Sequence, residues 1–214
     1  METLIYILRH GESVANSEGR VAGHSDSPLS ELGLKQADVA AEALSGVHFD
    51  AVYSSDLSRA YSTALPHAER RGLEITTDER LRELFVGDME NMFKTDIIDK
   101  FGTVYTVDWH EHFGTFVSPG GESVQDAACR VEAAITDIAK ANVGKCVLVA
   151  THAGVLRAFW GRISGVLPEA LCDKIGYATN ASYSVVKYDG ERLIPISYSN
   201  DGYLGDMRTE WKDK

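Results

Sequence analysis

A basic pair follows the first apolar segment of this chain. Residues 3–8 form a short apolar run that predicts a buried strand, and Arg9 and His10 come at its end. In open α/β sheets, ligands gather beyond the carboxyl ends of the strands, so a substrate can reach this pair. A neutral imidazole can act as a nucleophile, and a guanidinium can bind two oxygens of an anion. Gly11 then lets the backbone turn sharply beside a ligand.

Two further strand ends carry residues of the same kinds. Residues 50–53 predict a second strand, and Arg59 falls in the first turn of the helix expected after it. Residues 146–150 form a continuous apolar run, typical of a central parallel strand, and His152 follows it before another helix. Because the carboxyl ends of parallel strands lie at one edge of a sheet, these loops can face each other across one pocket. The sequence therefore predicts an anion-binding site.

The helices that must position this site have recognisable starts. Ser30 can cap a helix that Gly46 ends, and Ser123, with Asp126 three residues later, can cap another. Each helix is expected to bury an apolar stripe at a spacing near 3.6 residues. The first stripe consists of Leu34, Ala37, Ala40, Ala41 and Leu44, and the second of Val124, Ala127, Ala128, Val131, Ala134, Ile135 and Ile138.

A hairpin signal closes the expected sheet. The dipeptide Asp189-Gly190 predicts a tight turn between strands at residues 181–188 and 192–196. With the strand and helix alternation before it, the hairpin predicts an α/β fold of three layers, α/β/α, around a mostly parallel, mixed sheet. We expect a single domain over residues 1–214, with a polar, loosely docked C-terminal tail from about residue 198.

Residues 89–121 differ in pattern from the rest of the chain. Large apolar residues recur there at mostly helical intervals without a clear strand, which predicts a helical insertion over the site. Its rings can exclude water or contact an apolar part of a substrate, or they can simply pack the insertion onto the main domain. His110 and His112 would point together only on a strand, so we expect no metal site. The large apolar residues are Phe93, Ile97, Ile98, Phe101, Tyr105, Trp109, Phe113 and Phe116.

Composition and charge argue against several classes of protein. A formal net charge of -11 at pH 7, without a cluster of Lys and Arg, makes nucleic acid an unexpected partner. No apolar run approaches the roughly 20 residues that cross a bilayer, and the N-terminus lacks a signal-peptide pattern. We therefore expect a cytoplasmic protein without a membrane contact. The three cysteines suggest neither a disulfide framework nor a zinc site, and we expect Cys129 and Cys146 to be buried thiols.

Four separated runs match one known family in that family's order. The chain resembles the phosphatase branch of the histidine phosphatase (phosphoglycerate mutase-like) superfamily, which implies that His10 is transiently phosphorylated. The resemblance also implies that no cofactor and no metal are needed. The matching runs are R-H-G-E-S at residues 9–13, S-D-L-S-R-A-Y-S-T-A at 55–64, P-G-G-E-S at 119–123 and T-H-A-G-V-L-R at 151–157.

The same resemblance assigns the other residues of the site. The phosphoryl oxygens would be neutralised by Arg9, Arg59 and His152, the last as an imidazolium. An asparagine at the position of Asn16 helps to hold the phosphoryl group in the family, and its amide can donate such a bond here. The complete substrate-binding set is Arg9, Asn16, Gly23, Arg59, His152 and Ala153.

Glu83 is the expected acid and base. In the superfamily, a glutamate in its L-R-E-L context protonates the leaving oxygen and later deprotonates water. That role requires a raised pKa, which partial burial would provide. The alternative is a surface glutamate paired with Arg82. Residues 88–91, D-M-E-N, depart from the W-E-G ending that is usual in the family, which affects contacts with the substrate more than Glu83 itself.

The residues together predict a metal-independent phosphomonoesterase that hydrolyses a small phosphorylated metabolite. One alternative is a cofactor-dependent phosphoglycerate mutase, but such mutases carry a double arginine in the insertion, and residues 89–121 contain no arginine. A second alternative is a non-catalytic phosphoryl-ligand or protein-binding module, which would be favoured had His10, Glu83 or His152 been replaced. The substrate, and the choice between monomer and homodimer, stay open.

Overall fold

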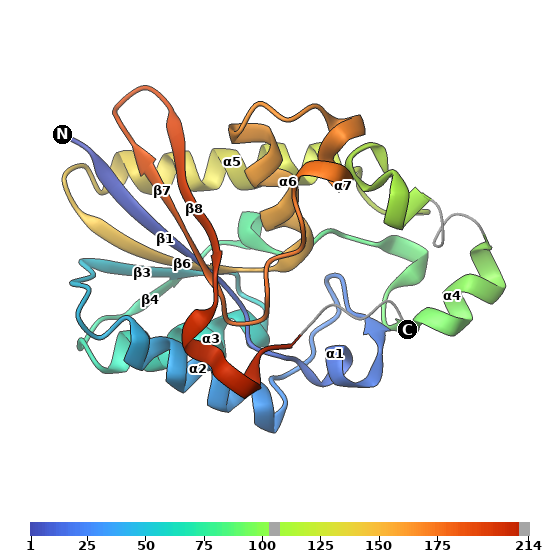
Figure 1. The fold of residues 1–214 in the computed structure, drawn as a ribbon, viewed down its shortest axis with the longest axis horizontal. Coiled ribbons are helices and arrows are strands. Elements are labelled where there is room, and N and C mark those ends of the chain that lie inside the picture. The colour runs from blue at the N-terminus through green and yellow to red at the C-terminus, as the bar shows by residue number, and fades with distance from the viewer. Residues whose placement is uncertain (103–107, 210–214) are drawn as a thin grey trace.

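A mixed sheet of six strands runs through the described residues, 1–102 and 108–209, of the computed structural model (Figure 1). Its strands are β1 (Thr3–Arg9), β3 (Ala51–Ser54), β4 (Ile75–Thr77), β6 (Cys146–Thr151), β7 (Tyr183–Tyr188) and β8 (Leu193–Asn200). Across the sheet their order is β4-β3-β6-β1-β7-β8. The first four are parallel, whereas β7 pairs antiparallel with β1 and β8 antiparallel with β7.

Helices cover both faces of the sheet. α2 (Glu31–Ala43) and α3 (Ser58–Glu69) lie on one face, and α5 (Val124–Ala141) and α6 (Ala153–Ile163) lie on the other (Figure 1). The predicted three-layer α/β/α fold with a mostly parallel mixed sheet is thus confirmed. The shorter helices are α1 (Val14–Glu18), α4 (Lys94–Phe101) and α7 (Leu171–Lys174), and the 3-10 turns are η1 (Glu79–Leu81), η2 (Gly87–Met89), η4 (Phe113–Thr115), η5 (Pro168–Ala170) and η6 (Gly202–Met207).

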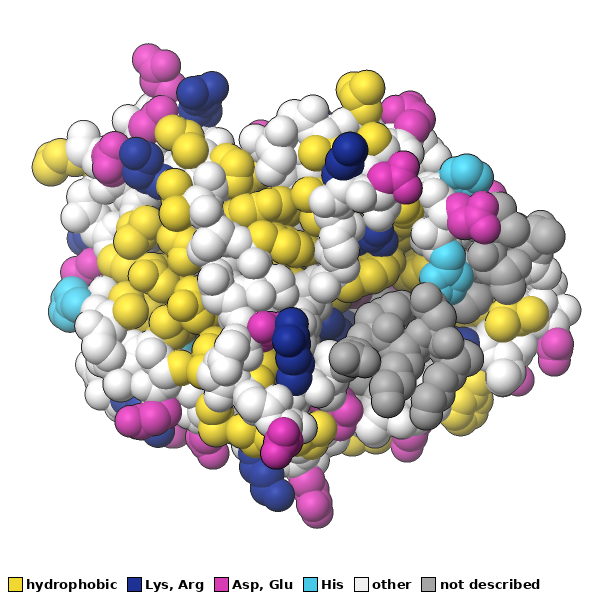
Figure 2. All heavy atoms as spheres, viewed as in Figure 1, with side chains coloured by type: hydrophobic (Ala, Val, Ile, Leu, Met, Phe, Trp, Pro, Cys, Tyr) yellow, Lys and Arg dark blue, Asp and Glu magenta, His cyan; other side chains and the backbone are white. Residues whose placement is uncertain are grey.

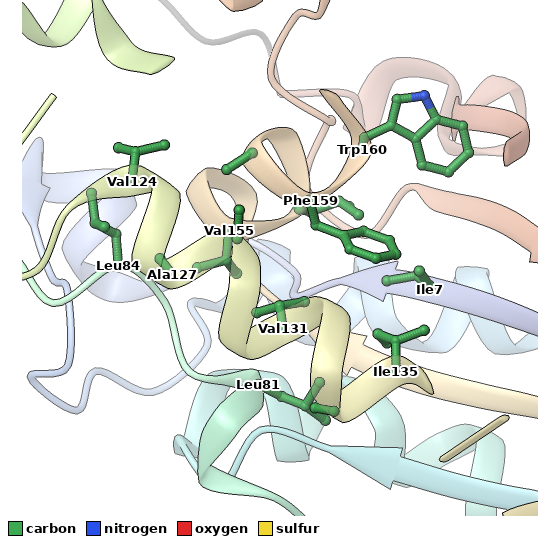
Figure 3. Packing of buried hydrophobic residues seen from close by; sticks show 14 of the residues in the cluster. Ile7, Leu81, Leu84, Val124, Ala127, Val131, Ile135, Val155, Phe159 and Trp160 are labelled. Carbon is green, nitrogen blue, oxygen red and sulfur yellow. The ribbon is translucent and has the colours of Figure 1, made fainter. Parts of the chain in front are cut away.

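The larger hydrophobic core lies between the sheet and the α5–α6 pair. Val131 and Ile135 of α5 meet Val155 and Phe159 of α6 above Ile7 of β1 (Figure 3). Burying an apolar side chain of this size stabilises a fold by about 1.5–3 kcal/mol. A second core forms on the opposite face from the smaller residues of α2 and α3. Because β1 is packed on both faces, the residue that follows it starts from a fixed position.

The register of the two central strands aligns the two candidate histidines. β1 pairs in parallel with β6, and Arg9 lies opposite Thr151. Both strands end at this level, and the backbone N–H of His10 donates to Thr151 O at 3.0 Å. His10 and His152 therefore leave the sheet side by side, with ring centroids 5.1 Å apart.

Both predicted serine caps are present. Ser30 Oγ accepts from the backbone N–H of Gly33 at 3.0 Å, and Ser123 Oγ accepts from that of Asp126 at 3.0 Å. Each bond satisfies a backbone donor that the first turn of a helix leaves without a partner, so the two helices start where the sequence predicts.

The predicted stripe of α2 is wrong at one position. Leu34 is 53% exposed, whereas the other four residues of that stripe are buried. The face turned inward includes Gly33, where an added Cβ would lie 2.0 Å from Glu12 O, and this close approach turns the next residue toward solvent. The helix also ends at Ala43, earlier than Gly46 would have placed it.

The C-terminal segment is ordered farther than the sequence predicts. β8 continues to Asn200 instead of ending at residue 196, and η6 follows it and packs against α2. Leu204 is buried, and the side-chain amide of Gln36 donates to Met207 O at 2.8 Å. The expectation of a loosely docked tail from about residue 198 is therefore wrong for residues up to 209. One buried leucine and a few polar contacts hold this segment against α2, although its sequence shows no regular spacing of apolar residues.

The insertion is mainly helical in its described part, but it also contains a short strand. β5 (Met92–Phe93) pairs antiparallel with β2 (Arg20–Val21), and two residues are too few to show the alternation that predicts a strand. The rings of Trp109, Phe113 and Phe116 are buried, and Trp109 packs edge-on against the other two. Most of the predicted apolar residues therefore pack the insertion onto the main domain. Phe93 and Ile98 are exposed, and Tyr105 lies outside the described residues.

The exposure of two cysteines differs from the sequence expectation. Cys129 is exposed and Cys146 is half-buried, so the expectation of buried thiols is wrong: Cys129 lies on the solvent side of α5, beside the buried Ala128.

On the face shown in Figure 2, the Lys and Arg side chains of the described residues are dispersed among Asp and Glu. Within the described ranges, every helix is too short or too polar to cross a bilayer.

His67 of α3 is a buried histidine outside the candidate site. It is fully buried, and neither ring nitrogen has a hydrogen-bond partner in the described residues. Burial, with Arg71 and Arg70 nearby, lowers the pKa of His67 to about 3. An unfolded histidine takes up its proton near pH 6.5, so the unfolded state binds more protons between those values. The free energy of unfolding should therefore fall as the pH drops from about 6.5 toward 3, by up to about 1.4 kcal/mol per pH unit for one proton.

His67→Leu, which replaces the titrating ring by an apolar side chain, is expected to flatten this pH dependence. The measurement is urea unfolding of wild type and variant at several pH values between 7 and 4. His48→Gln is the matched control, because the His48 side chain is 87% exposed. Equal slopes for wild type and His67→Leu would show that His67 does not titrate as the structure requires.

Candidate active site

His10 is positioned as a neutral nucleophile. Its Nδ1–H donates to Gly11 O at 2.6 Å, because a carbonyl oxygen can only accept, and this leaves the lone pair on Nε2. Burial, with Arg59 and Arg9 nearby, lowers the pKa of His10 well below its usual value. The ring therefore stays neutral in the range where an ordinary histidine would be charged.

Gly11 is required for close packing behind His10. A Cβ at this position would lie 2.5 Å from Gly33 O, at the start of α2. The Gly11 N–H donates to Thr63 Oγ1 of α3 at 3.0 Å. The loop after β1 is thus held against two helices, and this fixes the carbonyl that orients the His10 ring.

Arg9 is a buried cation with an unused donor. Its guanidinium donates through Nη1 to Ala178 O, while Nε has no hydrogen-bond partner in the described residues. Burial lowers the pKa of Arg9 to about 10, and the carboxylate of Glu83 opposes that shift. Arg9 remains charged at neutral pH, and an orphaned buried N–H at the pocket is costly unless an anion accepts from it.

Arg59 connects three parts of the site. Its Nη2 donates to Gly23 O at 2.6 Å, its Nη1 to Ser25 O at 3.0 Å and its Nε to His152 Nδ1 at 3.2 Å. The side chain is fully buried, and burial lowers its pKa, although the nearby Glu83 carboxylate favours the charge.

A Ser and an Asp just before a helix commonly cap it, but the helix that carries Arg59 starts differently. The residues of the S-D-L run do not cap it with their side chains. Asp26 instead accepts from Ser58 N at 2.9 Å and from Ser58 Oγ at 2.7 Å, and it comes from a loop more than thirty residues earlier. The first turn of α3 is therefore tied to the same loop whose carbonyls Arg59 binds.

The hydrogen bonds of His152 are those of a neutral ring, and the imidazolium expected with a phosphoryl group bound stays a prediction. Its Nδ1 accepts from Arg59, so its Nε2–H donates to Ser55 Oγ at 2.9 Å. Burial and the adjacent Arg59 lower the pKa of His152 well below its usual value. A second proton at Nδ1 would face the guanidinium. Only an anion bound between the two groups would favour that proton, because opposite charge stabilises the charged ring.

Glu83 is held at the N-terminus of α6. Its Oε2 accepts from Gly154 N at 3.0 Å, and its Oε1 accepts from Val155 N at 3.0 Å and Leu84 N at 2.9 Å. The position is crowded, since a Cβ on Gly154 would lie 2.8 Å from Oε1. The alternative of a surface glutamate paired with Arg82 is wrong, because Arg82 pairs with Asp56.

The predicted site residues converge on one pocket of about 920 Å³ at the carboxyl edge of the sheet. Its lining includes Arg9, His10, Asn16, Gly23, Arg59, Glu83 and Ala153. His152 is fully buried and its ring lies directly beside that of His10. Among residues 1–102 and 108–209, no three His, Cys, Asp or Glu side chains are grouped as metal ligands.

Sequence reasoning missed two residues that hold the site in place. Ser55 accepts from His152 and so fixes its tautomer; it lies in the matching run at residues 55–64, where only Arg59 was predicted as a site residue. The Glu90 carboxylate accepts from His24 N at 2.8 Å and from the N–H and hydroxyl of Ser25, and thereby supports the loop that Arg59 binds. The D-M-E-N departure drew attention to this run, but nothing local to it identifies the partners.

Two relatives of known name match nearly the whole chain. Phosphoserine phosphatase 1 of Hydrogenobacter thermophilus is 32% identical over 210 residues, which cover 96% of this chain and 96% of that protein. Metal-independent phosphoserine phosphatase of Arabidopsis thaliana is 35% identical over 207 residues, which cover 96% of this chain and 84% of that protein.

A solved structure and a family model agree with these relatives. Mycobacterial glucosyl-3-phosphoglycerate phosphatase, in its complex with VO3, superposes with a TM-score of 0.85 at 29% identity, over 92% of this chain and 99% of that one. The model of the histidine phosphatase superfamily (branch 1) matches residues 5–201. The predicted family is therefore confirmed, and the chain belongs to branch 1 of the histidine phosphatase superfamily.

Proposed function

We propose that this protein is a metal-independent phosphomonoesterase that hydrolyses a small phosphorylated metabolite through a phosphohistidine at His10. The observation that carries the proposal is the state of His10: a neutral ring, with its free Nε2 in a pocket that also holds two buried arginines. A neutral nucleophile beside fixed positive charge is what transfer of a phosphoryl dianion requires.

The first half of the reaction forms the phosphoenzyme. His10 Nε2 attacks phosphorus in line, and the bond between phosphorus and the ester oxygen breaks. Arg9, through its unpartnered Nε, and Arg59 neutralise the phosphoryl oxygens. Glu83 gives a proton to the departing oxygen, so the alcohol leaves neutral. A proton must first bind to Glu83, because its carboxylate otherwise only accepts hydrogen bonds.

The second half returns the enzyme to its starting state. Glu83, now ionised, takes a proton from a water molecule as that water attacks phosphorus. The bond between phosphorus and His10 Nε2 breaks, and inorganic phosphate leaves. While the ring carries the phosphoryl group on Nε2, its Nδ1–H keeps the bond to Gly11 O, so the ring need not turn between the two steps.

Hydrolysis accounts for the residues better than the alternatives do. A mutase must retain the phosphoryl group and bind the carboxylate of a phosphoglycerate, and the insertion at residues 89–121 has no arginine for that purpose. A pure binding module would not need a free Nε2 on His10 or a carboxylate held in the same pocket. The names of the relatives support phosphoserine and sugar-linked phosphoglycerates as the first substrates to test.

A panel of phosphomonoesters assayed in EDTA tests this proposal. We expect release of inorganic phosphate from at least one small metabolite, with phosphoserine, a glycosyl phosphoglycerate and 4-nitrophenyl phosphate in the panel, and no stimulation by added Mg²⁺ or Mn²⁺. Activity that appears only with added metal would reject the mechanism. Conversion of 3-phosphoglycerate to its isomer faster than any hydrolysis would favour the mutase instead.

A further inference from the structure

The segment from Ala178 to Ser182 wraps around the Arg9–His10 pair, although about 170 residues separate them in the chain. Ala178 O accepts from the Arg9 guanidinium, and Ser182 O accepts from Arg9 N at 3.0 Å. Ala181 N donates to His10 O at 3.1 Å. Ala181 adopts a left-handed conformation with φ 56°, which an alanine adopts only when its surroundings enforce it. The segment is therefore built to hold the nucleophile.

Asn180 is the side chain of this segment that faces the pocket. It is only 5% exposed, and its Nδ2 donates to His10 O at 3.2 Å and to Asn16 Oδ1 at 3.4 Å. Its Oδ1 accepts from Thr209 Oγ1 at 2.9 Å. The hydroxyl of Thr209 thus distinguishes the two ends of the Asn180 amide and sets which one points to Asn16.

The bonds to Asn16 determine which of its atoms is free for a ligand. Asn16 Oδ1 accepts from the backbone N–H of Ser13 at 3.2 Å and from Asn180. Two donors at the oxygen leave the Nδ2 of Asn16 on the opposite side of the amide, and the described residues offer it no acceptor. A carboxamide with its oxygen occupied presents two N–H donors to the pocket, the polarity that a phosphoryl oxygen needs.

We propose that Asn180 is a positioning residue that acts through Asn16, and that Thr209 orients it. Asn180 turns the N–H donors of Asn16 toward the transferred phosphoryl group. This inference rests on the proposed function and adds to it a buried chain of contacts, from Thr209 through Asn180 to Asn16, that links the C-terminal segment to the anion site.

A double-mutant cycle tests the coupling. Asn16→Ala and Asn180→Ala are each expected to lower kcat/KM by roughly tenfold, the effect of one lost hydrogen bond to a charged group. The double variant should have the same kcat/KM as Asn16→Ala, because Asn180 has nothing to position once the Asn16 side chain is gone. Effects that multiply in the double variant would overturn the proposal, as would full activity in Asn180→Ala.

Asn180→Asp gives a sharper contrast at nearly constant shape. It keeps an acceptor for Thr209 but replaces the Nδ2 donor by an oxygen, which would attract the Nδ2 of Asn16 and repel its Oδ1. We expect a loss in kcat/KM at least equal to that of Asn180→Ala, and a higher inhibition constant for vanadate. Wild-type values for this variant would contradict the proposal. Thr209→Val should cause a smaller loss in the same direction.

Controls separate this inference from the proposed function and from folding. Asn200→Ala is the matched variant, because Asn200 Nδ2 also donates to a backbone carbonyl, that of Tyr183, away from the pocket. It should leave kcat/KM unchanged. Thermal unfolding of each variant reports lost stability. Failure of the proposed function would appear as wild-type turnover that is independent of His10. The same double-mutant cycle can be measured without turnover, by calorimetry of inorganic phosphate binding to the Asn16→Ala, Asn180→Ala and double variants.

Discussion

His10→Ala is expected to lower kcat by roughly 10⁴-fold or more, as removal of a covalent nucleophile does in other enzymes. The structure gives His10 no substitute, because the described residues place no other imidazole with a free nitrogen in the pocket. The neighbouring ring of His152 has both nitrogens occupied, by Arg59 and by Ser55. Loss of the ring should therefore remove the covalent route entirely.

The pH dependence of kcat/KM in the wild type is a second test of the role of His10. Burial and two nearby arginines lower the pKa of His10, so the active, neutral form persists below pH 6.5. Protonation of His10 should therefore not reduce kcat/KM until the pH is well below that value.

His48→Ala serves as the control for His10→Ala, since the His48 side chain is 87% exposed. Residual turnover in His10→Ala within tenfold of wild type would contradict the assignment.

Glu83→Gln is expected to lower turnover to an extent that depends on the leaving group. For an alkyl ester such as phosphoserine, the alcohol must gain a proton as it departs, and we expect a loss of about 10²–10⁴-fold. For 4-nitrophenyl phosphate, the phenolate leaves without a proton, so phosphorylation of His10 should remain fast. Hydrolysis of the phosphoenzyme still needs the base. Rapid mixing should therefore show a burst of nitrophenolate, followed by slow turnover.

Glutamine preserves the volume of Glu83 and one acceptor for the N-terminus of α6, so this variant should fold. Glu79→Gln is the matched control, because the Glu79 side chain is 75% exposed and belongs to the preceding turn. It should behave as wild type with both substrates. Equal losses with phosphoserine and 4-nitrophenyl phosphate, without a burst, would show that Glu83 is not the proton donor.

The sequence predicts the positions of the chemical groups, because these follow from strand ends and motifs. Arg9 and His10 follow β1, His152 follows β6, and the parallel register between Arg9 and Thr151 brings the two rings together. The layers of the fold follow from the alternation of apolar runs with capped helices. These features depend on neighbours in the chain, which a sequence displays directly.

The protonation states and supports of the site were not accessible in the same way. The neutral state of His152 depends on Ser55 and Arg59, which lie more than ninety residues earlier. The orientation of Asn16 depends on Asn180, 164 residues away. Such pairings exist only after the chain has folded, and an asparagine in a loop carries no local sign of its partner. The exposed Leu34 illustrates the same limit, because tertiary packing overrides a spacing rule.

The central claim is that a phosphoryl group passes through His10. The most direct test incubates Glu83→Gln with 4-nitrophenyl phosphate, quenches the reaction in base and locates the modified peptide by mass spectrometry. We predict a phosphoryl group on His10, stable in base and lost in acid, and absent from the His10→Ala variant. A phosphoryl group on any other residue, or sustained wild-type turnover in which no phosphoprotein forms on any timescale, would contradict the account.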